Sequence, residues 1–326
     1  MRRVKAIVYL SHRQEPFTTV RDRLSREDFS DNVELMRAYD STHLSNLIAD
    51  AEVVLCFRIT DEILLKARNL RWIAFGMAGV DSVITDKMKD SDIIVTKAVG
   101  VADDAVAEHA IGMMLMLYRK LHLCMRSQIQ NRWLRSELVE KVMEINGSTV
   151  GVMGLGGIGK RVCRYLRVFG ARIYGYDKIE PGEEDLVDEF YSDGKLDEFL
   201  SCLDCLVLCL PLTEETFHII NADRLSTMKE GAYIVNVARG SVIDERALVE
   251  ALQREKIGGA ALDVFEREPL PPESPLYNLH NCIISPHIAG VTPNYWTRLA
   301  DQFIENLGRF INDEPLLYQV NKEMGY

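Results

Sequence analysis

The sequence has no long hydrophobic run. Its longest apolar stretch, residues 110–118, is far shorter than the roughly 20 residues that a membrane-spanning helix needs. The N-terminus, residues 1–10, is basic and then apolar, but it leads directly into polar residues and predicts a first strand instead of a signal peptide. We therefore expect no membrane partner.

The sequence also contains fewer positively charged than negatively charged residues. The 38 Lys and Arg residues are outnumbered by 49 Asp and Glu residues, so the formal net charge is −11. A chain this acidic is a poor match for the polyanionic surface of a nucleic acid or an anionic membrane. We expect no nucleic-acid partner, although a few local Arg side chains can still bind an anionic substrate in a cleft.

The cysteines form no disulfide pattern. Seven of them are scattered along the chain, and an odd number without regular spacing indicates a reducing compartment, the cytoplasm. Cys202 and Cys205 have the C-x-x-C spacing of a redox or zinc pair. No second pair or His cluster completes a zinc site, and the residues around Cys205 resemble a buried strand, so we interpret both as small hydrophobic residues and expect no metal.

Internal repeats, low-complexity tracts and Pro/Gly-rich linkers are absent as well. A chain of 326 residues is longer than a single hydrophobic core usually supports, so its length predicts two domains. Without a flexible linker, structured elements must join them. The candidates are two long amphipathic helices, one continuous over residues 103–123 and one beginning near Thr292. Asp103 or Asp104 is suited to cap the first of them.

What the chain does contain is a regular alternation of short apolar runs and helix-like segments. The alternation occupies the first hundred residues and returns after residue 148. Strands and helices that alternate in this way are typical of parallel sheets wrapped by helices. The predicted fold class is therefore α/β with two doubly wound parallel sheets.

The clearest motif is VGVMGLGGIG, residues 150–159, which lies between an apolar strand and a helix. The first glycine of such a loop permits a tight turn, the second lets the backbone approach a pyrophosphate, and the third allows close packing of helix on strand. The helix N-terminus then favours the anion. The loop residues that we expect to bind a dinucleotide are Gly154, Gly156, Gly157, Ile158 and Gly159.

The next strand supports the same interpretation, because it ends on Asp177. A carboxylate at this position accepts hydrogen bonds from the ribose hydroxyls of NAD and repels the additional phosphate of NADP. The order of strand, glycine loop, helix, strand and acid predicts NAD as the cofactor.

Three later strands end in side chains that could carry out chemistry. Arg239 follows one strand, Asp263 and Glu268 follow the next, and His287 follows the last. The guanidinium fork of an Arg can hold a substrate carboxylate, a His can exchange a proton, and a Glu can favour the charged form of the imidazole. Each alone would more often be a structural residue, but together beside a dinucleotide they predict hydride transfer.

From about Val53 to Phe310 the sequence resembles the D-isomer-specific 2-hydroxyacid dehydrogenases. The matching stretches are GVDSV, VAEHAIG, GVMGLGGIG, NVARGSVIDERAL, ALDVFEREPL and SPHIAG. The resemblance implies that Arg239, Glu268 and His287 are catalytic and that Asp263 receives the nicotinamide carboxamide. The further cofactor-binding residues that it implies are Leu210, Val237, Ala238, Arg239, Asp263 and His287.

The resemblance also implies a substrate site in the loop at residues 75–81, whose backbone N–H groups would bind the substrate carboxylate, with Gly76 and Gly79 allowing close approach. Arg58 matches a second cation of the family, although a plain surface Arg is an equally good interpretation. The implied substrate-binding residues are Arg58, Met77, Ala78, Gly79 and Arg239.

Such proteins have a discontinuous substrate domain. Here residues 1–100 and 291–326 would form a flavodoxin-like substrate domain, into which residues 101–290 are inserted as a Rossmann NAD-binding domain. Relatives dimerise through the region that corresponds to residues 103–145, so we expect a homodimer.

We therefore predict an NAD-dependent oxidoreductase that interconverts a short 2-keto acid, such as glyoxylate, hydroxypyruvate or pyruvate, and its D-2-hydroxy acid. The alternative is a dimeric NAD(H)-sensing scaffold or corepressor on the same fold, and a turnover assay separates the two. The first fifty residues, including His12 and Arg13, match nothing specific, and this leaves the identity of the substrate open.

Overall fold

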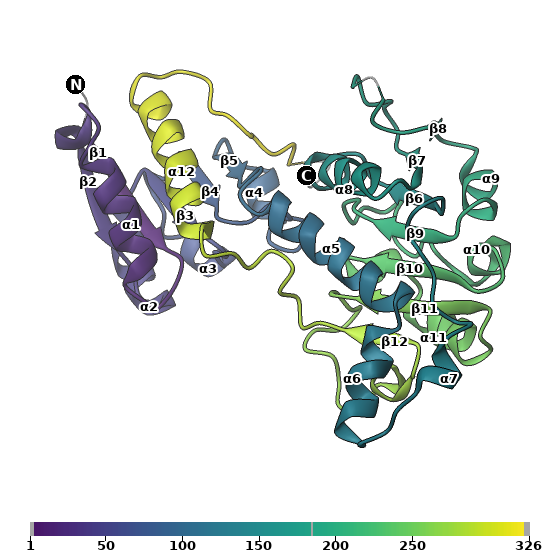
Figure 1. The fold of residues 1–326 in the computed structure, drawn as a ribbon. Coiled ribbons are helices and arrows are strands. Elements are labelled where there is room, and N and C mark those ends of the chain that lie inside the picture. Colours follow the sequence, from purple (N-terminus) through teal and green to yellow (C-terminus); the bar gives the residue numbers. More distant parts are fainter. Residues whose placement is uncertain (1–2, 184, 323–326) are drawn as a thin grey trace. The chain divides into compact units, whose positions relative to one another are not determined.

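A computed structural model describes residues 3–183 and 185–322 of the chain (Figure 1). The chain divides into two compact units. The first unit comprises Met1–Val101 and Thr292–Tyr326, and the second comprises Ala102–Val291. Each unit contains one sheet whose strands all pair in parallel, which confirms the predicted α/β fold.

The sheet of the first unit has the strand order β2-β1-β3-β4-β5. This is the order of flavodoxin-like sheets, in which successive strands are added on either side of β1. The strands are β1 (Val4–Tyr9), β2 (Val33–Arg37), β3 (Val53–Cys56), β4 (Trp72–Phe75) and β5 (Ile94–Lys97). Nearly all of β1, β3 and β4 is buried, as expected for a parallel sheet covered on both faces.

Helices cover this sheet, and one of them comes from the far end of the sequence. The helices of the first unit are α1 (Glu15–Leu24), α2 (Ser41–Leu47), α3 (Asp61–Leu64), α4 (Asp86–Lys89) and α12 (Tyr295–Ile311). Helix α12 contacts α1, and its Phe303 stacks on Trp72 of the sheet with the ring centroids 5.2 Å apart. The predicted apolar stripe of this helix is therefore its buried face.

The sheet of the second unit has the order β12-β11-β10-β9-β6-β7-β8. Counted within the unit, β8-β7-β6-β9-β10-β11 is the 3-2-1-4-5-6 order of a Rossmann fold, extended by one strand. The strands are β6 (Thr149–Met153), β7 (Arg172–Tyr176), β8 (Glu189–Tyr191), β9 (Cys205–Leu208), β10 (Ala232–Asn236), β11 (Ile257–Leu262) and β12 (Cys282–Ile284).

The helices of the second unit are α5 (Asp103–Tyr118), α6 (Leu121–Ile129), α7 (Arg135–Leu138), α8 (Gly157–Val168), α9 (Leu196–Ser201), α10 (Ala222–Thr227) and α11 (Glu245–Gln253). Helices α5 and α8 pack against each other. Short 3₁₀ helices occur at Ser30–Asn32, Ile48–Asp50, Gly240–Val242 and Pro275–Asn278.

The prediction of one continuous helix over residues 103–123 is wrong. Lys120 has a left-handed backbone with φ of 55°, which ends α5 and starts α6 in a new direction. Its buried ammonium donates a hydrogen bond to the hydroxyl of Tyr233 over 2.6 Å. This tertiary contact stabilises the break between the two helices. No Gly or Pro beside Lys120 predicts the break from the sequence.

The N-cap prediction for the same helix is wrong too. Ala102 occupies the cap position, and Asp103 is the first helical residue. The carboxylates of Asp103 and Asp104 instead bind the guanidinium of Arg161 on the neighbouring α8. They therefore join two helices instead of capping one.

The cysteines are free thiols, and most of them are packed in the two cores. Burial raises the pKa of Cys163 and of Cys282 to about 12, so both thiols stay protonated at neutral pH. Within residues 3–183 and 185–322, no helix is long and apolar enough to cross a membrane.

Candidate functional site

The cofactor-binding and catalytic residues that we predicted in the second unit all lie beyond the carboxyl ends of its parallel strands. The strands β6, β7, β9, β10, β11 and β12 each lead into a loop that carries at least one of them. Open α/β sheets bind their ligands at this edge. The strand order brings together loops that are separated by more than a hundred residues in the sequence.

The glycine loop follows β6 and has the geometry that its sequence predicts. Gly154 has φ of +93°, and a Cβ there would lie 2.7 Å from the backbone nitrogen of Leu210. A Cβ at Gly159 would overlap the carbonyl oxygen of Gly154, so only glycine lets α8 begin this close to the strand. A Cβ at Gly156 would meet no atom within 4 Å. Backbone with open space at the start of α8 fits the pyrophosphate of a dinucleotide.

Asp177 follows β7 and borders this loop. Its Oδ2 accepts a hydrogen bond from the backbone N–H of Leu155 over 2.6 Å, and its Oδ1 accepts one from the N–H of Lys178 over 2.7 Å. The ammonium of Lys178 is paired with Glu215. An acid at the end of the second Rossmann strand, with the neighbouring cation neutralised, fits a ribose with free hydroxyls.

Arg239 follows β10 on a loop that is held by hydrogen bonds on one side and by close packing against the next loop on the other. The buried side chain of Asn236 donates to the carbonyl of Arg239 and accepts from the N–H of Ala238, each over 3.0 Å. Next to it, a Cβ at Gly240 would overlap the backbone of Phe265. The loops after β10 and β11 can therefore touch only because residue 240 is glycine.

His287 and Glu268 form a direct pair. Nδ1 of His287 lies 2.6 Å from Oε2 of Glu268, and Oε1 of Glu268 accepts the N–H of Phe265 over 3.0 Å. An ionised carboxylate can only accept, so the imidazole carries a proton on Nδ1 and its Nε2 remains for another partner. The side chains are 51% and 36% exposed, so the pair is open to a ligand.

The turn that carries His287 is attached to Asp263. His287 has φ of 52°, an unusual conformation for a residue with a side chain, and its N–H donates to the carbonyl of Asp263 over 2.9 Å. The carboxylate of Asp263 accepts the N–H groups of Ile288 over 3.0 Å and of Ala289 over 2.9 Å. Because this carboxylate is only 1% exposed, its hydrogen bonds fix the turn firmly.

Two residues of this network were missed by the sequence analysis. The hydroxyl of Ser285 lies 2.6 Å from Oδ1 of Asp263, and Nε2 of His109 on α5 lies 2.9 Å from the same hydroxyl. The single hydroxyl proton goes to the carboxylate, so His109 must donate from Nε2. Both residues lie in stretches that were singled out, VAEHAIG and SPHIAG, but no local pattern shows that they meet. The role predicted for Asp263 toward the nicotinamide remains a prediction.

The predicted substrate loop lies in the first unit, after β4. The N–H of Gly76 donates to the carbonyl of Cys56 over 2.9 Å, and the carbonyl of Met77 accepts from Ala98 over 3.0 Å. The hydroxyl of Tyr295 on α12 donates to the carbonyl of Gly76. Burial raises the pKa of Tyr295 to about 12, so this donor keeps its proton at neutral pH. The loop is thus held by hydrogen bonds to Cys56, Ala98 and Tyr295.

The other substrate residues that we predicted in this unit follow two neighbouring strands of the same sheet. Ala78 is exposed and Gly79 is half-buried within the loop after β4. Arg58 is exposed and follows β3, the strand next to β4. The structure therefore brings Arg58 and the loop to one edge of the sheet.

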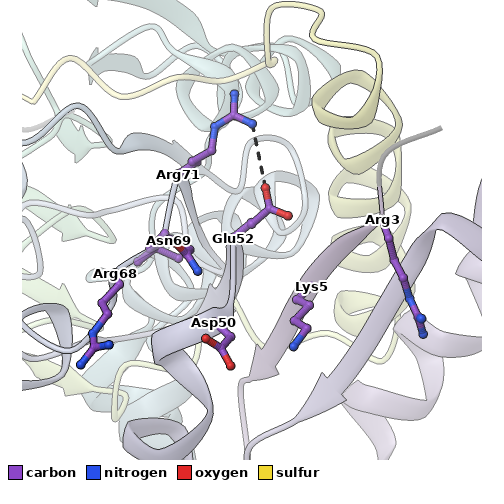
Figure 2. Close-up of a pocket in the computed structure, with 8 residues that line it drawn as sticks. Arg3, Lys5, Asp50, Glu52, Arg68, Asn69 and Arg71 are labelled. Carbon is purple, nitrogen blue, oxygen red and sulfur yellow. Dashed lines mark ion pairs between the residues drawn. The ribbon is translucent and has the colours of Figure 1, made fainter.

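A pocket of about 510 Å³ lies at the opposite edge of this sheet, before the amino ends of β1, β3 and β4 (Figure 2). Its charges are mixed: Arg71 lies 4.0 Å from Glu52, and Arg3 lies 3.8 Å from Glu34 just outside the pocket. None of the predicted site residues is among its lining residues, which are Arg3, Lys5, Asp50, Glu52, Arg68, Asn69, Leu70 and Arg71.

Comparison with known proteins agrees with this geometry. Residues 111–289 match the family model described as "D-isomer specific 2-hydroxyacid dehydrogenase, NAD binding domain". The chain is 36% identical to a glyoxylate reductase of Thermofilum pendens over 85% of this chain and 83% of that protein. It is 34% identical to an (S)-sulfolactate dehydrogenase of Chromohalobacter salexigens over 77% and 81% of the two chains.

A solved structure is similar over nearly the whole chain. It is an NADPH-dependent glyoxylate/hydroxypyruvate reductase from Sinorhizobium meliloti in complex with NADP and sulfate. The TM-score is 0.85 at 27% identity, covering 99% of this chain and 100% of the other. The chain therefore belongs to the D-isomer specific 2-hydroxyacid dehydrogenases, which confirms the family and the enzyme class that its motifs predicted.

Proposed function

We propose that this protein interconverts a short 2-keto acid and its D-2-hydroxy acid with NAD(H) as the cofactor. In this proposal His287 exchanges the proton, Glu268 is its partner, and Arg239 binds the substrate carboxylate. The observation that carries the proposal is the 2.6 Å contact between His287 and Glu268, on a turn and a loop that buried hydrogen bonds hold in place.

The chemistry follows from the protonation of this pair. NADH, held by the glycine loop and Asp177, supplies the hydride when it is bound. The keto oxygen gains negative charge during reduction and takes a proton from Nε2 of His287. Glu268, which accepts from Nδ1, orients the imidazole and leaves Nε2 for the substrate. In the reverse direction the neutral imidazole removes the hydroxyl proton.

Arg239 suits the carboxylate because its planar guanidinium can form two parallel hydrogen bonds. Its loop is fixed by Asn236, and its Nη1 donates to the carbonyl of Ala238 over 2.7 Å. A fixed loop keeps the fork in place before substrate arrives, which lowers the entropic cost of binding.

We propose that the protein prefers NAD to NADP as its cofactor. The neighbouring structure from Sinorhizobium meliloti contains NADP. In this chain, Asp177 places a carboxylate where a ribose phosphate would need a cation, and Lys178 is paired with Glu215. The residues proposed to line the rest of the site, Leu210, Val237 and Ala238, are buried at the ends of β9 and β10.

For assembly, the proposal is a homodimer. Apolar side chains of residues 121–142 are exposed in the second unit, and Trp133 is 86% exposed. An exposed apolar patch of this kind is typical of an interface with another protein, and a two-fold dimer is the commonest arrangement. The exposed members are Leu121, Met125, Ile129, Trp133, Val139 and Val142. Free cysteines in both cores support the cytoplasm as the compartment.

The experiment that tests the function is turnover. NADH oxidation is followed with glyoxylate, hydroxypyruvate, pyruvate and larger 2-keto acids, and the His287→Ala variant serves as the control. We expect turnover with at least one keto acid and a loss of roughly 10²–10⁴-fold in kcat in the variant, with NADH binding retained. Absence of turnover with every keto acid would contradict the proposal and favour a nucleotide-sensing role.

A further inference from the structure

A buried carboxylate lies beside the glycine loop that is proposed to bind the pyrophosphate. A Cβ at Gly157, the first residue of α8, would overlap Oδ2 of Asp103. A Cβ at the preceding Gly156 would meet no atom within 4 Å. Because consecutive Cα atoms are about 3.8 Å apart, the carboxylate of Asp103 lies on the order of 5–10 Å from the open space at the start of α8.

The position of this carboxylate suits α5 but not a bound anion. Asp103 and Asp104 lie in the first turn of α5, where the helix dipole favours negative charge. Asp103 is only 7% exposed, so water and salt screen its charge poorly. The pyrophosphate of a dinucleotide is itself an anion, and a carboxylate this close to the loop opposes its binding.

Arg161 on α8 lies between these carboxylates and the loop. Its Nη1 is 3.1 Å from Oδ2 of Asp103, and its Nε is paired with Oδ1 of Asp104. The same Nη1 donates to the carbonyl of Gly157 over 3.1 Å. A guanidinium keeps its charge at every pH used in an assay. Arg161 therefore places a fixed positive charge at the start of α8.

The other basic residues in the first half of α8 have a different partner. Lys160 and Arg164 both pair with Glu183 of the loop after β7, over 3.1 Å and 2.7 Å. Their charge is therefore taken up on another side of the helix, while Arg161 faces α5.

The remaining charged residue of this contact is acidic. Glu108 lies one turn beyond Asp104 on α5. Burial raises the pKa of Tyr165 on α8, Asp104 and Glu108 raise it further, and Arg161 lowers it. Negative charge therefore exceeds positive charge between the two helices even with Arg161 present, and loss of Arg161 would increase this excess.

We propose that Arg161 is a positioning residue for the cofactor: it neutralises Asp103 and Asp104, so that the pyrophosphate binds at the start of α8 without repulsion from α5. Arg161 acts through the two carboxylates. The same arrangement requires glycine at residue 157, because a larger side chain would displace the carboxylate of Asp103. This inference rests on the proposed function, since it concerns how the same cofactor binds.

The test compares two competitive inhibitors, ADP-ribose, which contains the pyrophosphate, and adenosine, which does not. In Arg161→Gln we expect the inhibition constant of ADP-ribose to rise roughly tenfold, the effect of a partly screened charge at this distance. The constant of the uncharged adenosine should stay within about twofold of the wild type. The KM for NADH should rise with that of ADP-ribose, while kcat at saturating NADH stays unchanged.

A second substitution tests whether the carboxylate is the cause. Asp103→Asn keeps the shape of the side chain and removes its charge, so Arg161→Gln/Asp103→Asn should bind ADP-ribose within about threefold of the wild type. Raising the salt concentration to about 0.5 M should bring Arg161→Gln closer to the wild type, because screening weakens the repulsion. A purely structural role of Arg161 predicts neither result.

The matched control is Arg167→Gln. Arg167 pairs with Asp188 over 2.6 Å and lies on the same helix, about 9 Å further from the loop than Arg161. Its removal changes the net charge equally and should leave both inhibition constants unchanged. Arg161→Lys keeps the charge and loses the planar fork, so it should bind ADP-ribose nearly as well as the wild type. This variant carries the test where Arg161→Gln does not fold.

The outcomes separate this inference from the proposed function. An unchanged constant for ADP-ribose in Arg161→Gln overturns the inference, and so does an equal loss for adenosine, which would indicate a distorted loop. A loss that persists in Arg161→Gln/Asp103→Asn, or that Arg161→Lys shows in full, overturns it as well, because the carboxylates would then not be the cause. Failure of the wild type to bind NADH and ADP-ribose overturns the proposed function itself.

Discussion

Nδ1 of His287 and Oε2 of Glu268 lie 2.6 Å apart, although they come from loops after different strands. The other oxygen of Glu268 accepts the N–H of Phe265 over 3.0 Å, so the carboxylate cannot rotate away without losing a second hydrogen bond. This arrangement orients the imidazole and sets which nitrogen is available to a substrate.

The first prediction concerns this pair. Glu268→Gln keeps the shape of the side chain but replaces a charged acceptor at Nδ1 of His287 by a neutral amide, which can also present its N–H groups to the ring. The imidazole is then held less firmly in the orientation and tautomer that leave Nε2 for the substrate. We expect kcat/KM to fall roughly tenfold or more in both directions, while NADH still binds. Wild-type kcat/KM in this variant would remove Glu268 as the partner of His287.

The second prediction concerns Arg239. Arg239→Lys keeps the charge but loses the planar fork, so at least one hydrogen bond to the substrate carboxylate is lost. We expect kcat/KM to fall roughly tenfold to a hundredfold, while NADH still binds. Arg267→Lys, an exposed residue of the loop after β11, is the control and should behave like the wild type. Wild-type kinetics in Arg239→Lys would exclude a bidentate role.

Cofactor choice is the third prediction. Asp177→Ala removes the carboxylate that repels a ribose phosphate, so the ratio of kcat/KM with NADH to that with NADPH should fall. Glu180→Ala removes the same charge from an exposed position nearby and should leave the ratio unchanged. A wild-type enzyme that uses NADPH more efficiently than NADH would contradict the proposal of NAD.

The fourth prediction concerns the hydroxyl between His109 and Asp263. Ser285→Ala leaves a buried carboxylate oxygen and an imidazole N–H without this partner, which should lower the free energy of unfolding by about 1–3 kcal/mol. Urea unfolding measures the change, and Ser226→Ala at an exposed position should stay within about 0.5 kcal/mol of the wild type. A Ser285→Ala variant as stable as the wild type would show that water replaces the hydroxyl.

The fifth prediction concerns assembly. Light scattering at micromolar concentration should give twice the chain mass of 37.0 kDa. Ile129→Glu introduces a charge into the exposed apolar patch and should lower the mass toward that of one chain. Ile179→Glu is the control, since the two side chains are 83% and 80% exposed but Ile179 lies outside the patch. A wild type that is monomeric, or a dimer that Ile129→Glu leaves intact, would contradict the proposed interface.

Much of the fold could be predicted because its determinants are local. Apolar runs alternating with amphipathic segments indicate parallel strands and helices, and Gly154 and Gly159 are required because a Cβ at either position would meet backbone atoms. The candidate site was largely predictable for a related reason. Parallel strands bring their carboxyl ends to one edge, so Asp177, Arg239 and His287 could be assigned to that edge without knowing the strand order.

Other features depend on contacts between distant residues and leave no local pattern. The break at Lys120 is held by Tyr233 of β10, which is 113 residues away in the sequence, and the sequence around Lys120 continues to favour helix. His109 and Ser285 are separated by 176 residues, so only the packing of α5 beside the end of β12 brings them together.

The sequence by itself thus determined the fold class, the nucleotide loop and the residue types of the site, since each depends on the backbone or on strand periodicity. Only the tertiary structure decided how those residues are held. Asp263 is one example: its position at a strand end follows from the sequence, but its attachment to the turn around His287 is a property of two loops that meet in space. Hydrogen bonds of this kind depend on distances between chain segments, which a linear pattern does not contain.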